Sequence, residues 1–98
     1  MTYDIIISSD ALQDIQQAIN YYDDQQAGLG KKFEMTLNTH FISLKKNPFF
    51  QVHYDNIRCL PLRKYPYTIH FTLDEKVKTI IIRAVFHTSL DPEKWKIR

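Results

Sequence analysis

Cysteine is nearly absent from this 98-residue sequence, which contains Cys59 alone. A single cysteine excludes an internal disulfide and any multi-cysteine metal site, so we expect a reduced, cytoplasmic protein. No apolar run approaches the roughly 18 residues that a membrane span requires. The first ten residues also lack the basic start and long apolar stretch of a signal peptide. We therefore expect no membrane partner.

The composition is that of one globular domain covering residues 1–98. Hydrophobic residues make up 44% of the sequence and aromatic residues 13%, which argues against disorder. The charge is unevenly distributed. Residues 1–56 carry four Lys against seven acidic residues, a net charge of −3, whereas residues 57–98 carry nine Lys or Arg against four acidic residues, a net charge of +5. The basic half indicates an anionic partner, either a nucleic acid or an acidic protein segment, unless the charges cluster by chance.

The hydrophobic pattern predicts an α+β fold. An N-terminal strand at residues 3–7 is followed by helices at residues 10–26 and 31–46, which the pair Gly28 and Gly30 separates into an antiparallel hairpin. We expect the hairpin to pack on one face of a small, mainly antiparallel sheet. Its strands are predicted at residues 57–63, 67–73 and 77–87, with a short edge strand near residues 51–54. A C-terminal tail, residues 91–98, is expected to be pinned by Trp95.

Alternation along these strands separates a dry face from an open one. Apolar positions such as Ile80, Ile82, Ala84 and Phe86 are expected to face the helices. The complementary positions place four basic side chains on the open face, namely Arg63, His70, Arg83 and His87. Arg suits phosphate oxygens and His exchanges protons near neutral pH, so this set could bind or cleave a phosphate backbone. The alternative is a set of ordinary exposed residues or contacts for a protein partner.

Other reactive side chains favour structural roles. His40 and His53 are interpreted as surface or packing residues, and Cys59 as a small apolar residue that has no activating neighbour. The spacing of His and carboxylate residues predicts no metal site, and nothing in the sequence indicates a cofactor.

Three motifs together resemble the RelE/ParE superfamily of bacterial toxins, which belong to type II toxin–antitoxin modules and are often named plasmid stabilisation proteins. The motifs are Arg58-x-Leu60-x-Leu62, the corner Tyr65–Pro66–Tyr67-x-Ile69, and the ending His87-x-Ser89-x-Asp91–Pro92-x-x-Trp95-x-x-Arg98. The resemblance covers nearly the whole chain, and the order of elements agrees. It implies a growth-inhibiting toxin that a cognate antitoxin neutralises.

The superfamily holds two mechanisms on one fold. RelE-type members cleave messenger RNA, usually on the ribosome, and ParE-type members inhibit DNA gyrase without a known hydrolytic site. The Pro66–Tyr67 corner resembles the ParE-like branch, because Tyr67 stands where several ribonuclease members have a catalytic Arg. His87 matches a histidine that some nucleases use, and Arg83 lies near a basic position of others.

The sequence therefore favours a gyrase-blocking toxin, with a ribosome-dependent endoribonuclease as the alternative. His87 and Arg83 would be catalytic only in the ribonuclease. Many relatives have an Arg where this chain has Leu90, so a third possibility is an inactive module that only binds antitoxin. The contact of that Arg would be lost or taken over by a cation of the tail, Lys94, Lys96 or Arg98. The residues expected to bind the target or its phosphates are Arg63, Tyr67, His70, Lys94 and Arg98.

Overall fold

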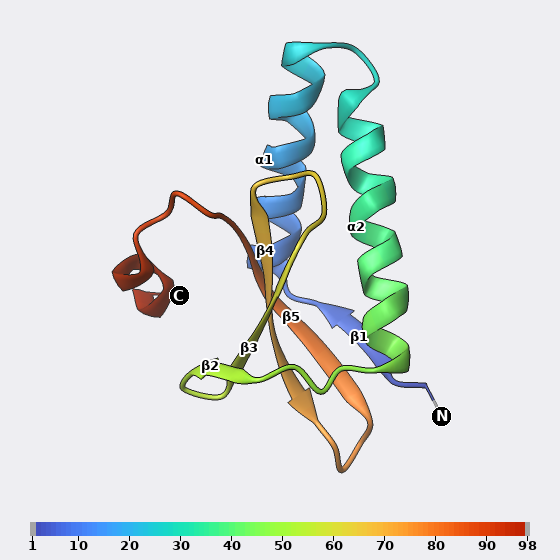
Figure 1. The fold of residues 1–98 in the computed structure, drawn as a ribbon, viewed down its shortest axis with the longest axis vertical. Helices are drawn as coiled ribbons and strands as arrows, with labels where there is room; N and C mark the ends of the chain where they lie inside the picture. Colours follow the sequence, from blue (N-terminus) through green and yellow to red (C-terminus); the bar gives the residue numbers. More distant parts are fainter. Residues whose placement is uncertain (1, 98) are drawn as a thin grey trace.

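The computed structural model describes residues 2–97, and the side chains of residues 2–95. Within this range the chain forms two α-helices and one five-stranded sheet, followed by a short 3-10 helix (Figure 1). The elements, in chain order, are β1 (Asp4–Ile7), α1 (Ser9–Gln25), α2 (Leu29–Lys46), β2 (Val52–Tyr54), β3 (Ile57–Pro61), β4 (Tyr67–Asp74), β5 (Thr79–His87) and η1 (Pro92–Ile97). The predicted α+β class and the predicted order of elements are confirmed.

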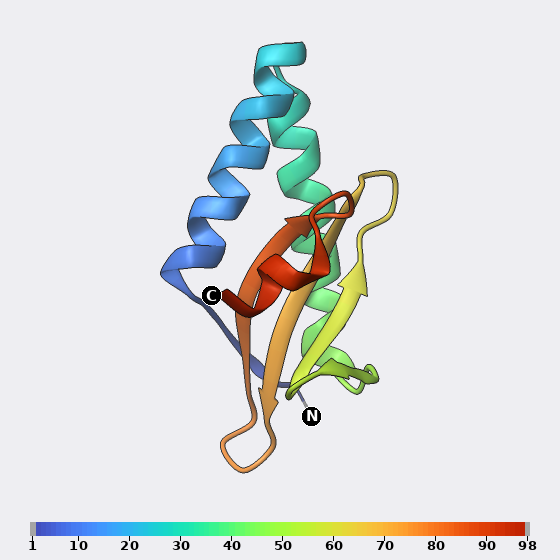
Figure 2. The ribbon, with the colours of Figure 1, turned by 90° about the vertical axis from the view of Figure 1, so that its left-hand side faces the viewer.

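The sheet has the strand order β1-β5-β4-β3-β2, in which β1 and β5 are parallel and the other pairs are antiparallel. The sheet lies between two unequal layers. The helical hairpin occupies one face and extends well beyond the strands, while η1 lies against the other face (Figures 1 and 2). Neither helix of the described chain is long and apolar enough to cross a membrane.

The helical hairpin begins with a cap, turns at Gly28 and packs closely at Gly30, which lies inside α2. The Ser8 hydroxyl accepts a hydrogen bond from the Ala11 amide at 3.1 Å, which satisfies one of the free amides at the start of α1. Gly28 has a φ of 92°, in the left-handed region, and is the last residue of the loop between α1 and α2. Gly30 allows the helices to approach closely, because a Cβ atom there would lie 2.6 Å from the Ile19 carbonyl oxygen.

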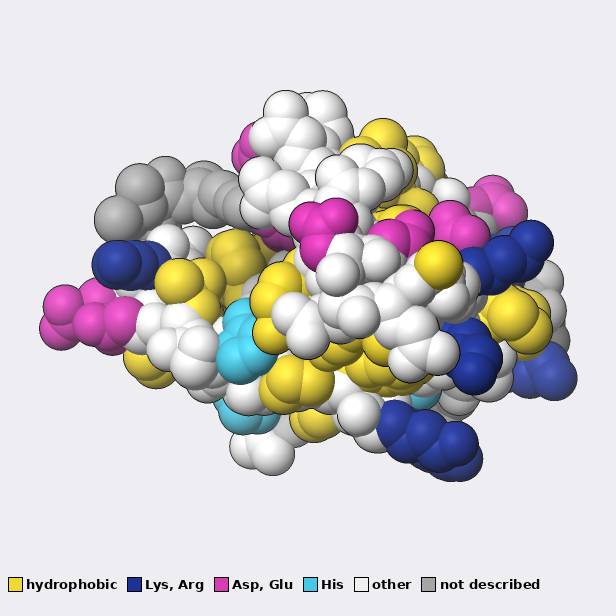
Figure 3. Space-filling view, turned by 90° about the horizontal axis from the view of Figure 1, so that it is seen from above, with side chains coloured by type: hydrophobic (Ala, Val, Ile, Leu, Met, Phe, Trp, Pro, Cys, Tyr) yellow, Lys and Arg dark blue, Asp and Glu magenta, His cyan; other side chains and the backbone are white. Residues whose placement is uncertain are grey.

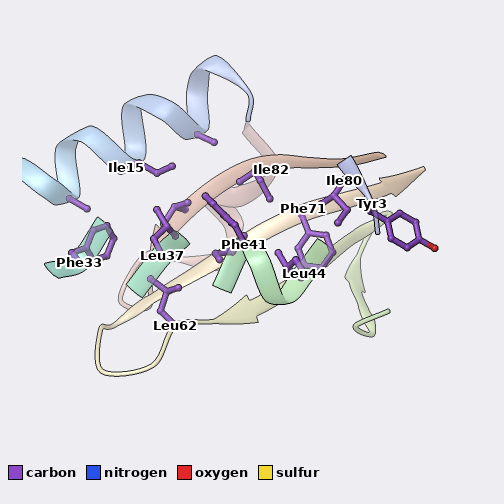
Figure 4. Packing of buried hydrophobic residues seen from close by; sticks show 14 residues of the cluster. Tyr3, Ile15, Phe33, Leu37, Phe41, Leu44, Leu62, Phe71, Ile80 and Ile82 are labelled. Carbon is purple, nitrogen blue, oxygen red and sulfur yellow. The ribbon is translucent and has the colours of Figure 1, made fainter. Parts of the chain in front are cut away.

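The core lies between the hairpin and the sheet. Figure 4 shows Ile15 of α1 and the α2 residues Phe33, Leu37, Phe41 and Leu44 over the strands. All five are buried, and they join a cluster that also contains Leu62, which follows β3, and the sheet residues Ile69, Phe71, Ile80, Ile82 and Val85. The helical stripes and the inner positions of β4 are thus as the periodicity predicts.

A β-bulge in β5 reverses the expected alternation. Phe71 pairs with Ile82, and His70 pairs with Ala84, so Arg83 is an extra residue without an opposite partner in β4. Beyond it, Val85 faces the helices, and its amide donates a hydrogen bond to a carboxylate oxygen of Asp14 in α1 at 3.0 Å. The prediction that Ala84 and Phe86 face the helices is therefore wrong, although both residues are buried.

Candidate functional site

The four basic residues predicted on one open face lie in separate environments. His70 is fully buried beneath the C-terminal tail, Arg83 is exposed at the bulge, His87 lies beside Tyr67, and Arg63 lies next to α2. The prediction of one open face shared by all four residues is therefore wrong, although Arg83 lines a hollow with Trp95, which covers His70. Its failure has three physical causes: the bulge, the cover that the tail provides, and a turn after β3.

His70 occupies the centre of the sheet face that η1 covers. Its ring centroid lies 4.7 Å from that of Trp95 and 4.9 Å from that of Phe86, and the Tyr54 hydroxyl lies 2.9 Å from His70 Nδ1. We call Trp95 and the η1 turn that carries it the tail cap. The position of His70 on this face follows the predicted alternation, but its predicted exposure is wrong, because the tail cap removes it from water.

Cys59 contributes to the same buried cluster. Its Sγ atom lies 3.6 Å from His70 Nδ1, and burial raises the pKa of the thiol to about 11. At neutral pH the thiol is therefore protonated and a poor nucleophile. The interpretation of Cys59 as a small, partly buried structural residue agrees with this environment.

Arg83 stands exposed at the border of the tail cap. Its Nε donates a hydrogen bond to Thr72 Oγ1 at 3.2 Å, and its carbonyl accepts one from the Ser8 hydroxyl at 3.3 Å. It lines a shallow hollow of about 560 Å³ next to the β4–β5 turn. Lys94, also exposed, belongs to η1 and is therefore part of the tail cap itself. Arg98 lies outside the described residues.

Tyr67 and His87 form a second surface on the helix side of the sheet. The two residues are cross-strand partners, and their rings are 5.1 Å apart in an edge-to-face arrangement. With Tyr21 and Leu90 they line a hollow of about 320 Å³ against α1, which we call the Tyr67–His87 surface. Burial, and to a smaller extent Tyr21, raises the pKa of Tyr67, so its hydroxyl stays protonated near neutral pH.

His87 is held in one tautomer when neutral. Its Nδ1 accepts hydrogen bonds from the Ser89 amide at 3.0 Å and from the Ser89 hydroxyl at 2.7 Å. Because Nδ1 is an acceptor, the proton of the neutral ring is on Nε2. An exposed imidazole with a fixed N–H can donate a hydrogen bond to a ligand.

Arg63 lies on the opposite side of the hairpin, beside α2. Its backbone amide donates a hydrogen bond to His40 Nε2 at 3.3 Å, and its side chain is exposed. Sequence reasoning assigned His40 to packing or surface and did not foresee this bridge, since no local pattern links residues 40 and 63. No group of three or more potential metal-binding side chains gathers within the described part of the chain.

Comparison with known proteins gives a match in structure but not in sequence. No model of a known protein family matches the chain, and no curated protein matches it. A solved structure of the chromosomal ParDE toxin–antitoxin system of P. aeruginosa is similar with a TM-score of 0.77 and 14% identity, over 88% of this chain and 96% of that chain.

Two further structures are similar over most of their length. The toxin–antitoxin complex RelBE2 of Mycobacterium tuberculosis has a TM-score of 0.63 and 14% identity, over 89% of this chain and 99% of that chain. A mutant of the E. coli toxin RelE in the free state has a TM-score of 0.69 and 12% identity, over 98% of this chain and 93% of that chain. These likenesses confirm that the chain has the RelE/ParE fold that its motifs imply.

Proposed function

We propose that this chain is the toxin of a bacterial type II toxin–antitoxin module, that it acts in the cytoplasm, and that a cognate antitoxin neutralises it. The observation that carries the proposal is the structural likeness to ParDE over 88% of this chain and to RelE over 98% of it. The basic C-terminal half and the three sequence motifs support it independently.

For the target, the geometry favours inhibition of DNA gyrase over cleavage of RNA. Cleavage by a 2′-hydroxyl requires a base, an acid and a cation around one phosphate. Of the candidates, His70 is buried, while Arg83 and His87 lie in different hollows. Of the three structures compared above, ParDE also has the highest TM-score, 0.77 against 0.69 for RelE and 0.63 for RelBE2. We assign target contact to the Tyr67–His87 surface. Arg63 and Lys94 lie on other elements, so their predicted contacts with the target or its phosphates would form outside this surface.

Ribonuclease activity is the second candidate, because His87 is exposed and an imidazole that has gained a proton can serve as a general acid. In that case His87 would act as the acid and Arg83 would stabilise the charged transition state. Loss of a general acid typically costs about 10²–10⁴ in rate. His87→Ala should then abolish RNA cleavage, and Arg83→Ala should reduce it strongly. An inactive antitoxin-binding module is the third candidate, since Leu90 contributes only an apolar side chain to the Tyr67–His87 surface.

Induced expression in a bacterial host, without antitoxin, tests the proposal. Growth should stop, purified protein should inhibit gyrase supercoiling, and transcripts should keep their normal 5′ ends. Tyr67→Ala should relieve the arrest in protein that circular dichroism shows to be folded, a check that is needed because the Tyr67 ring also packs against Phe33. Lys76→Ala, an exposed change in the β4–β5 turn, should not relieve it. New transcript ends that disappear in His87→Ala would identify the ribonuclease instead. Normal growth with verified soluble protein would exclude both activities.

A further inference from the structure

The hollow of the Tyr67–His87 surface has one wall that carries negative charge. This wall is a face of α1, from which Asp14, Gln17 and Tyr21 line the hollow. The three residues follow one another at helical spacing, so a carboxylate, an amide and an aromatic ring lie in a row along α1. No Lys or Arg is among the described residues that line the hollow.

This wall differs from the rest of a basic protein. Helix α1 contains four Asp and neither Lys nor Arg, whereas α2 contains four Lys and one Glu. Figure 3 shows Lys and Arg side chains mainly toward the right of the view, the side on which α2 lies in Figure 1. A cation that approaches the α1 side therefore meets attraction from the helix rather than repulsion.

The Asp14 carboxylate is held in place by the uncovered edge of β5. Strand β1 pairs with β5 only as far as Ile82, so the Val85 amide lies beyond the paired part. This amide donates its hydrogen bond to Asp14 Oδ2 at 3.0 Å. Because an amide donor has no net charge, the bond fixes the carboxylate at one end of the hollow without neutralising it.

Aromatic rings line the other end of the hollow. Tyr21 is 56% exposed, and the exposed His87 ring lies 5.1 Å from that of Tyr67. The face of an aromatic ring has negative quadrupole charge and attracts a cation within about 6 Å of its centre. Asp14 and Tyr21 are two helical turns apart, about 10 Å along α1. A cation between them would therefore meet the carboxylate on one side and an aromatic ring on the other.

From this combination we infer that the Tyr67–His87 surface binds an exposed arginine side chain of the target protein. The planar guanidinium would lie between Asp14 and the rings, and the stem would pack on the apolar side chain of Leu90. A hollow of about 320 Å³ is small among ligand sites, which span roughly 300–1,000 Å³, so it suits one side chain. The inference rests on the proposed function only for the identity of the partner. A nucleotide fits less well, because Asp14 would repel its phosphates.

The test uses the full chain, labelled with ¹⁵N, at pH 8 and constant ionic strength. The probe is N-acetylarginine amide, and its matched control is N-acetylcitrulline amide, which has nearly the same shape but no charge. The arginine probe should produce saturable amide shifts at Tyr21, Tyr67 and His87, with a dissociation constant in the millimolar range. The citrulline probe should bind about threefold to thirtyfold more weakly. Adenosine monophosphate should not shift these amides.

Paired variants separate the proposed contacts from net charge and from folding. Asp14→Asn should weaken arginine binding at least about threefold, while its amide oxygen can still accept the bond from Val85. Glu75→Gln changes the net charge equally in the exposed β4–β5 turn and should leave binding unchanged. Tyr21→Leu should weaken binding, whereas Tyr21→Phe, which keeps the ring, should not. Tyr21 is exposed, so these two variants remain informative if Asp14→Asn does not fold.

Several results would overturn the inference. These are the absence of saturable shifts, equal binding of the citrulline probe, shifts of the same amides by adenosine monophosphate, or equal affinities of Tyr21→Leu and Tyr21→Phe. Growth arrest and gyrase inhibition by a chain that does not bind the arginine probe would refute this inference alone. Binding of the arginine probe by a chain that affects neither growth nor gyrase would instead refute the proposed toxin.

Discussion

Replacing Phe33 by leucine should destabilise the fold through the loss of ring contacts rather than of volume. Phe33 is fully buried in α2, and its ring lies 5.4 Å from Tyr22, 5.2 Å from Tyr65 and 5.3 Å from Tyr67. Each aromatic pair contributes about 0.5–1.5 kcal/mol beyond burial. Because neighbouring contacts are not fully additive, we expect a loss of about 2–4 kcal/mol in the free energy of unfolding.

A matched variant isolates this effect. Phe41 is also a buried α2 residue, but it makes no ring contact with any described residue, so Phe41→Leu should cost only about 1 kcal/mol. Urea denaturation measures both, with an unchanged m-value as the check that the unfolded state is the same. For a domain of this size the difference corresponds to roughly 5–20 °C in Tm. Equal losses in the two variants would refute the ring-contact reasoning.

Three other changes have definite expected outcomes. Trp95→Ala should expose His70, so that diethyl pyrocarbonate modifies this histidine faster; an unchanged rate would mean that the tail cap does not protect it. Gly30→Ala should lower the free energy of unfolding by about 1–3 kcal/mol in urea titrations, because the added Cβ meets the Ile19 carbonyl oxygen at 2.6 Å; a neutral effect would contradict the close helix approach. With its pKa raised to about 11, Cys59 should react slowly with iodoacetamide near pH 8 and faster as the pH rises toward that value; unfolding in urea should remove the protection.

The sequence was sufficient for the fold because its local signals agree with one another. The apolar stripes of both helices, the left-handed Gly28 between them and the alternation in β4 all depend on neighbouring residues, and the structure contains each of them. Gly30, which the sequence also predicts between the helices, lies inside α2. The ends of the elements differ by only a few residues. The strand predicted at residues 57–63, for example, ends at Pro61, since the chain turns toward α2 after that position.

The candidate site could not be predicted in the same way, because its geometry depends on contacts between distant segments. The bulge at Arg83 has no local signature: neither a glycine nor a proline marks it, and three isoleucines precede it. A strict alternation continued past this bulge assigns Ala84 and Phe86 to the helix side of the sheet, which is the wrong face. Burial of His70 depends on Trp95, which lies 25 positions later in the sequence. The roles assigned to His87, Tyr67 and the cations remain predictions that the experiments above address.

The tail cap also gives the chain an intrinsic optical probe. Trp95 is the single tryptophan of the sequence, and it lies against Tyr54, His70 and Phe86 on the outer face of the sheet. Selective excitation of its indole therefore reports on one contact, the docking of the last turn. Release of the tail would move the indole from this aromatic cluster into water, so both the intensity and the wavelength of its emission would change. Movement of this segment on addition of the proposed antitoxin or target can thus be followed in unlabelled protein, in real time.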